Sequence, residues 1–140
     1  MTKPVRAADI DIGYTLPEVT HGPVERVNLA LFAAYSGDHN PIHLDDEQAR
    51  ANGLPGAIVH GMLSMAYLAQ VLTGWVPQSQ LRSFGSRFAA MAYPGDTIRC
   101  KGVVAGKESA NGETVFEVTL VAENQKGEGL LSGSAKVALT

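Results

Sequence analysis

The chain has 140 residues, a formal net charge of -3, and 45% hydrophobic against 18% charged residues. This length suits one domain with a substantial core and is too short for two ordinary domains, and the composition excludes an intrinsically disordered chain. The 11 Lys and Arg residues are scattered. No basic stripe faces a phosphate backbone, so nucleic-acid binding is not expected.

The N-terminal segment and the longest apolar run indicate no membrane targeting. Residues 1–6 include basic residues with no apolar run behind them, so we expect no signal peptide. The apolar segment at residues 61–72 is interrupted by Ser64 and Gln70 and is shorter than the ~20 residues of a membrane span. Cys100 is the only cysteine, which leaves no internal disulfide and is compatible with a reducing compartment. We therefore expect a soluble, cytoplasmic protein.

Two helices are predicted in the first half of the chain, before the long apolar segment. The first covers residues 25–35, ends before Gly37, and carries apolar side chains at helical spacing at Val27, Leu31 and Ala34. The second covers residues 46–52. Asp45 can cap its start, acidic residues suit the positive end of its dipole, and Gly53 can end it.

Residues 61–73 predict a third helix of a different kind. Apolar side chains cover most of its circumference, which is typical of a helix buried in the middle of a domain. At ~1.5 Å per residue it would span about 20 Å, roughly the width of a small sheet. The prediction therefore requires a sheet that wraps this helix.

The second half of the chain supplies four candidate strands with partial alternation of apolar and polar residues: 82–92, 97–104, 114–122 and 130–139. Turn signals at Pro94-Gly95-Asp96, Asn111-Gly112 and Lys126-Gly127 separate them. Cys100 shares a face with Ile98, which favours core packing over a nucleophilic role. Because the helical period gives way to the strand period once, near Pro77, we predict an α+β domain with helices on one face of an antiparallel sheet.

The segment from Tyr35 to Asp46 concentrates ionisable residues between two predicted helices. Gly37 permits an unusual backbone angle and Pro41 stiffens the loop, so its side chains can be aimed as acid–base groups. The alternative is that this loop only caps a helix and forms a turn, without a catalytic role. A calcium loop fails because Ile42 stands where an oxygen ligand is needed. A zinc site from His39, His43 and Asp45 is a weaker alternative, since Pro41 opposes a helical histidine pair.

A second segment, Ala57 to Leu63, begins the apolar helix with His60-Gly61-Met62. Free backbone N–H groups at a helix start carry partial positive charge and can stabilise a developing oxyanion. Glycine at this position would let a substrate carbonyl approach closely. Taken alone, such a glycine is more often a packing device, and His60 alone is more often a loop or core residue.

The two segments together resemble the signature of the MaoC-like, (R)-specific enoyl-thioester hydratase family. The first motif is Asp38-His39-Asn40-Pro41-Ile42-His43, preceded by Tyr35-Ser36-Gly37, and the second is Val59-His60-Gly61-Met62. The stretch Phe88 to Asp96 looks like the conserved strand and turn of the family. The resemblance covers roughly residues 20–140, and the pair of motifs is far more specific than either alone.

The resemblance implies a single MaoC-like hot-dog domain over residues 1–140, in which a curved antiparallel sheet wraps a long central helix. It identifies Asp38 and His43 as the catalytic pair and the Gly61 N–H as the oxyanion donor. Asn40 would steady the loop, His60 would contribute to substrate binding or loop support, and His39 occupies a variable position. No metal and no cofactor are expected.

The implied activity is reversible hydration of trans-2-enoyl thioesters to (R)-3-hydroxyacyl thioesters, as in fatty acid metabolism. The substrate would be carried on coenzyme A or on acyl carrier protein, and the chain would form a homodimer, with a heterodimer as the alternative. Two other readings compete with this one. A hot-dog thioesterase would share the fold but lacks this Asp–Asn–Pro–His loop, and a non-catalytic acyl-thioester-binding or partner subunit of a hetero-oligomeric dehydratase would tend to lose the catalytic pair.

Overall fold

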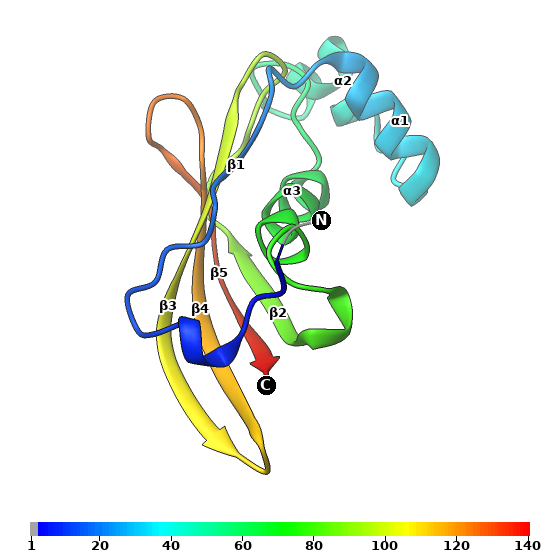
Figure 1. The fold of residues 1–140 in the computed structure, drawn as a ribbon. Helices are drawn as coiled ribbons and strands as arrows, with labels where there is room; N and C mark the ends of the chain where they lie inside the picture. The colour runs from blue at the N-terminus through cyan, green and yellow to red at the C-terminus, as the bar shows by residue number, and fades with distance from the viewer. Residues whose placement is uncertain (1–2) are drawn as a thin grey trace.

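One five-stranded sheet curves around one helix in the computed structural model, which describes residues 3–140 (Figure 1). The strands are β1 (Val19–His21), β2 (Leu81–Phe88), β3 (Ile98–Ala110), β4 (Glu113–Glu123) and β5 (Gly129–Leu139). They are ordered β1-β3-β4-β5-β2, and every pairing is antiparallel. Residues 1–2, at the start of the segment for which no signal peptide is expected, lie outside the described residues.

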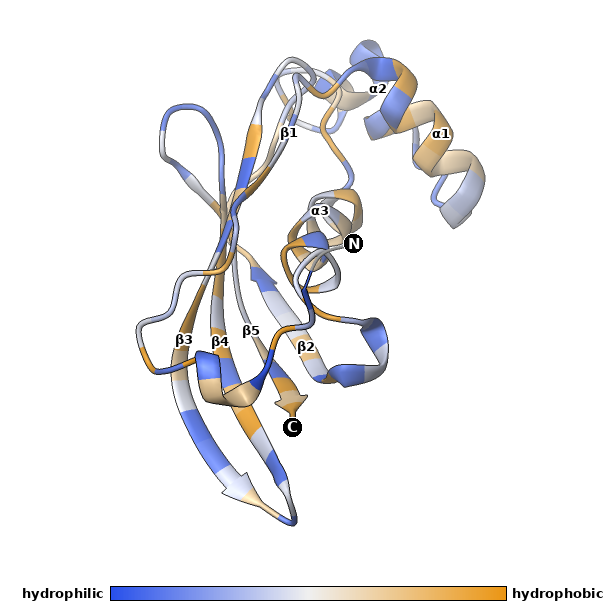
Figure 2. Cartoon of the chain, in the orientation of Figure 1, coloured by the Kyte–Doolittle hydropathy of each residue, from blue (hydrophilic) through white to orange (hydrophobic). Residues whose placement is uncertain are grey.

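The central helix α3 (Gly61–Thr73) has the bounds that the sequence predicts. It contacts β1, β2, β3 and β4 on the concave side of the sheet, and Figure 2 shows hydrophobic residues along it. A side chain at Gly102 would come within 3.3 Å of Val71, because helix and sheet approach closely there. This sheet wrapped around a helix is the hot-dog arrangement that the resemblance implies.

The face that Ile98 and Cys100 were predicted to share is buried, and apolar residues of β4 are buried as well. Phe116, Val118 and Leu120 on β4 have no exposed surface, as do Ile98 and Cys100 on β3. The Asn111-Gly112 turn joins β3 to β4 with both residues at positive φ, which is what a tight hairpin requires. Strand β2 ends at Phe88, earlier than expected, and β3 extends to Ala110. The short strand β1, paired with β3, was not predicted.

Two helix faces differ from their sequence patterns. The helix α1 (Arg26–Ser36) forms as predicted, but Leu29 and Ala33 are its buried residues, whereas Val27 and Leu31 are about half exposed. Apolar residues occur on two sides of α1, so the period alone did not select the inward face. The helix α3 is covered on one side only, since Met62, Ala66 and Gln70 are exposed.

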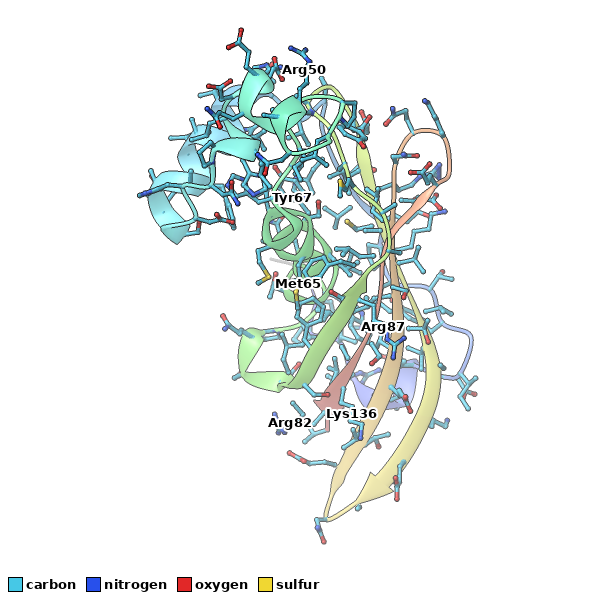
Figure 3. All side chains as sticks on the ribbon, turned by 180° about the vertical axis from the view of Figure 1, so that it is seen from behind. Arg50, Met65, Tyr67, Arg82, Arg87 and Lys136 are labelled. Carbon is cyan, nitrogen blue, oxygen red and sulfur yellow. The ribbon has the colours of Figure 1, made fainter. Side chains whose placement is uncertain are left out.

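Two further helices, α1 and α2, flank the polar loop that precedes α3. Helix α1 and helix α2 (Asp46–Ala51) lie beyond one end of α3, away from the sheet (Figure 1). Arg50 on α2 lies at the opposite end of the molecule from Arg82 and Lys136, in agreement with the scattered basic charge (Figure 3). Over residues 3–140, no helix has the length and hydrophobicity to cross a membrane.

We predict that Cys100 is unreactive in the folded protein. Its side chain is fully buried, and burial raises the pKa of the thiol to about 12, so the reactive thiolate is absent near neutral pH. A thiol reagent such as DTNB should leave the native protein unmodified and should titrate one thiol after unfolding in guanidinium. Rapid stoichiometric reaction under native conditions would contradict this burial.

Candidate active site

The loop between α1 and α2 is held in shape by its own side chains. Gly37 ends α1 in the left-handed conformation, with φ of 78°. The Asp38 N–H donates to Ser36 Oγ at 3.1 Å, and the Asn40 N–H donates to Asp38 Oδ1 at 3.3 Å. Asn40 Oδ1 then accepts from the Ile42 N–H at 3.2 Å, which caps a 3-10 turn at Pro41–His43. The loop is therefore a fixed turn that ends at His43.

His43 is the buried end of this loop. Its ring Nδ1 lies 2.8 Å from the carbonyl oxygen of Ile58, and a carbonyl can only accept, so Nδ1 carries the proton. In the neutral imidazole, Nε2 then carries the free lone pair. The Nε2 atom lies 3.6 Å from Asp38 Oδ2. The Asp38 side chain is 49% exposed whereas that of His43 is 8% exposed. The pair thus combines a buried imidazole with a carboxylate that water reaches.

A second histidine lies directly beneath the first. The rings of His60 and His43 stack with centroids 3.8 Å apart, and Phe32 from α1 meets His60 edge-on. His60 Nε2 donates to the backbone carbonyl of Asp38 at 3.2 Å, while its Nδ1 is buried without a partner among the described residues. Burial lowers the pKa of His60. His60 is therefore a neutral platform that contacts both members of the Asp38–His43 pair.

The stacking also argues against a metal site. Asp38, His43 and His60 offer possible ligand atoms within 4.8 Å of one another. However, the two imidazole planes are only 20° from parallel, and each ring already donates one N–H to a carbonyl. Nearly parallel rings do not aim their lone pairs at one tetrahedral ion. The zinc alternative is weaker still, since Asp45 uses its carboxylate to cap α2 and His39 is exposed.

Gly61 begins α3 immediately after His60, and among the described residues no backbone carbonyl accepts from its N–H. A Cβ at this position would lie 2.9 Å from the Phe88 ring, so glycine is needed here for close packing. Next to it is a cavity of about 120 Å³ with mostly apolar walls. The lining residues are Ile58, Val59, Gly61, Ser64, Phe88, Ala90, Met91, Ala92, Leu130 and Leu131.

The structure thus brings together most of the predicted site residues. Asp38, His43 and His60 are in mutual contact, Asn40 braces their loop, and Gly61 is the next residue of the chain after His60. Sequence reasoning missed the Ile58 carbonyl and the His43–His60 stack. The first is a backbone group that any residue could supply, so the sequence carries no signal for it.

Comparison with known proteins shows the family. The sequence profile of the MaoC-like domain family matches residues 10–126. Enoyl-CoA hydratase ChsH3 of Mycobacterium tuberculosis is 36% identical over 72 residues, which cover 49% of this chain and 25% of that relative. The fatty acid synthase subunit beta of Aspergillus oryzae is 33% identical over 111 residues, 77% of this chain but 5% of that protein. The chain therefore spans only a small part of these relatives.

The fold is shared with solved structures over nearly the whole chain. The R-hydratase PhaJ1 from Pseudomonas aeruginosa, in its unliganded form, superimposes with a TM-score of 0.83 and 28% sequence identity. The match covers 96% of this chain and 84% of that one. The family profile matches most of the chain, and the fold agrees with it. The chain therefore belongs to the MaoC-like dehydratase domain family.

Proposed function

We propose that this protein catalyses the reversible hydration of trans-2-enoyl thioesters to (R)-3-hydroxyacyl thioesters. The observation that carries the proposal is the Asp38–His43 pair, whose Oδ2 and Nε2 atoms lie 3.6 Å apart beside the start of α3. Relatives named as an enoyl-CoA hydratase and an R-hydratase support the reaction and its stereochemistry. That residues 1–140 form a single domain remains a prediction.

His43 and Asp38 would divide the proton transfers between them. In hydration, the pair holds the water that attacks C3 of the enoyl group and takes up its proton, and the protonated pair then delivers a proton to C2. The Nδ1–H bond to Ile58 leaves His43 Nε2 as an acceptor, which suits the imidazole as base toward water. The exposed Asp38 carboxylate can accept a hydrogen bond from the same water. Dehydration runs the same steps in reverse.

The Gly61 N–H would stabilise the charge that develops on the thioester oxygen. Attack at C3 moves an electron pair toward this oxygen, and a helix N-terminus offers an oriented donor without reorganisation. The apolar cavity beside Gly61 is a candidate place for the acyl group, and coenzyme A or acyl carrier protein would bear it. Asn40 would support the loop, and His60 would support both catalytic side chains.

The Asp38→Asn variant should lose the reaction while keeping the fold. The substitution preserves size but removes the charge, and general acid–base groups typically contribute ~100-fold or more to the rate. The measurement is the change in enoyl-thioester absorbance with crotonyl-CoA and longer 2-enoyl-CoAs, and His43→Gln should behave alike. Asp9→Asn, which alters an exposed carboxylate paired with Arg6, serves as the control.

Two results would count against the proposal. Near-normal hydration by Asp38→Asn would remove the assigned acid–base pair. Absence of hydration by the folded wild type, with both coenzyme A and carrier-protein thioesters, would favour a non-catalytic partner subunit. Chiral analysis of the 3-hydroxyacyl product tests the (R) assignment separately.

The neutral state assigned to His60 predicts a pH dependence of stability. Its pKa is lowered in the folded protein, so below the ordinary value of 6.5 the unfolded chain binds a proton that the folded protein does not. The free energy of unfolding should therefore fall as pH decreases from about 7 to about 5. In His60→Phe this slope should be smaller by up to about 1.4 kcal/mol per pH unit. Equal slopes in urea titrations of both proteins would contradict a buried neutral His60.

We also propose that the chain pairs with a second copy along β2. Among residues 3–140, this strand is an edge of the sheet and pairs with β5 alone, and an unpaired edge is a template for another strand. Exposed apolar side chains lie at its end and just after it, namely Phe88 and Met91, and Met62 is exposed on α3.

Size-exclusion chromatography with light scattering should therefore report twice the mass of the chain. A purely monomeric protein at micromolar concentration that still hydrates enoyl thioesters would overturn the dimer. An insoluble or inactive chain that becomes active with a non-identical partner would indicate the heterodimer.

A further inference from the structure

We propose that Asp46, held by Arg26, is a positioning residue for the His43 imidazole. The inference rests on the function proposed above, in which His43 exchanges a proton with the substrate. Asp46 itself lies outside the Asp38–His43 motif and is assigned no contact with the reacting atoms. Its effect would pass through the backbone of Ala57 and Ile58.

The Asp46 carboxylate joins three separate parts of the chain. Its Oδ1 accepts a hydrogen bond from the Ala57 N–H at 2.8 Å. Arg26, at the start of α1, donates from Nη2 to Oδ2 at 2.8 Å and to Oδ1 at 3.0 Å. Asp46 is the first residue of α2, so one side chain ties α1, α2 and the segment that leads to α3.

These contacts close a ring through His43. The chain runs from His43 to Asp46 in three residues, and the Asp46 carboxylate then holds the Ala57 N–H. The next residue, Ile58, donates its N–H to the Ile42 carbonyl at 3.1 Å and accepts from His43 Nδ1 at 2.8 Å. In this closed set of contacts, the Asp46–Ala57 bond is the one whose acceptor is a side chain, so a substitution at the half-buried Asp46 can remove it without touching His43.

The packing around Asp46 is adapted to this bond. A Cβ at Gly56 would come 3.2 Å from Asp46 Oδ1, so the backbone approaches the carboxylate as closely as glycine allows. The Ala57 N–H and the Arg26 guanidinium lower the pKa of Asp46, which keeps it ionised near neutral pH. All three of its hydrogen bonds are therefore charge-assisted and stronger than neutral ones.

The consequence concerns the tautomer of His43. As long as the Ile58 carbonyl faces Nδ1, the proton stays on that nitrogen and Nε2 stays free toward Asp38. If the backbone of residues 57–58 shifts, the His43 imidazole loses its bond to the Ile58 carbonyl, and both tautomers of His43 become accessible. Misplacement of a catalytic group by ~1 Å can cost up to ~100-fold in rate.

The test compares Asp46→Ala, Arg26→Ala and Asp46→Asn with wild type. We expect Asp46→Ala to lower kcat about 10- to 100-fold with little change in KM, and Arg26→Ala to do so less. Asp46→Asn retains an oxygen for the Ala57 N–H and should recover most of kcat. In each protein, nitrogen-15 NMR of the labelled histidine rings reports the tautomer, with His43→Gln assigning the His43 signals. Asp46→Ala and Arg26→Ala should populate both tautomers of His43.

The control is Asn124→Ala. Like Asp46, Asn124 accepts backbone N–H groups with its side chain, in this case those of Lys126 and Glu128, but it lies in the β4–β5 turn. It should lower the Tm without changing the His43 tautomer. A pure Nδ1–H tautomer in both Asp46→Ala and Arg26→Ala would overturn the proposal whatever their turnover, as would an equal loss of kcat in Asn124→Ala. Should wild type hydrate no thioester, the proposed function fails while the tautomer comparison still decides the role of Asp46.

Discussion

The site depends on the hydrogen bond between His43 Nδ1 and the Ile58 carbonyl. This bond joins the loop after α1 to the segment before α3. The two segments are separated in the sequence and are brought together by the fold. It also determines which nitrogen of the imidazole is free. A buried ring with one nitrogen committed to a carbonyl is a directional acceptor at the other nitrogen, which is the property that proton transfer at an enoyl thioester requires.

The neutral platform under His43 has an electrostatic purpose. Two stacked imidazoles whose centroids lie 3.8 Å apart would repel strongly if both were charged in a site of low dielectric. Burial lowers the pKa of His60, so this ring stays uncharged near neutral pH. His60 thus supplies contact area and a donor to the Asp38 backbone, and it need not compete for protons with the proposed catalytic pair.

The sequence predicted the scaffold better than the contacts. The bounds of α3, the alternation along β4 and the Asn111-Gly112 turn follow from local period and turn chemistry, and the structure has all three. The inward face of α1 and strand β1 were missed, because both depend on what lies opposite them in space. In the site, motif residues could be named from resemblance, whereas the Ile58 carbonyl and the Ala57 N–H are backbone groups without any sequence signal.

The same division explains where a neighbour of the motif can control it. Residues that touch substrate must be chemically particular, so a motif records them. Residues that only hold backbone need an acceptor at one point in space, and a carboxylate, an amide or a different loop can provide it. Asp46 belongs to this second kind, since its partners are one N–H and one guanidinium. What the proposed chemistry constrains is the position of the Ile58 carbonyl, rather than the identity of the group that supports it.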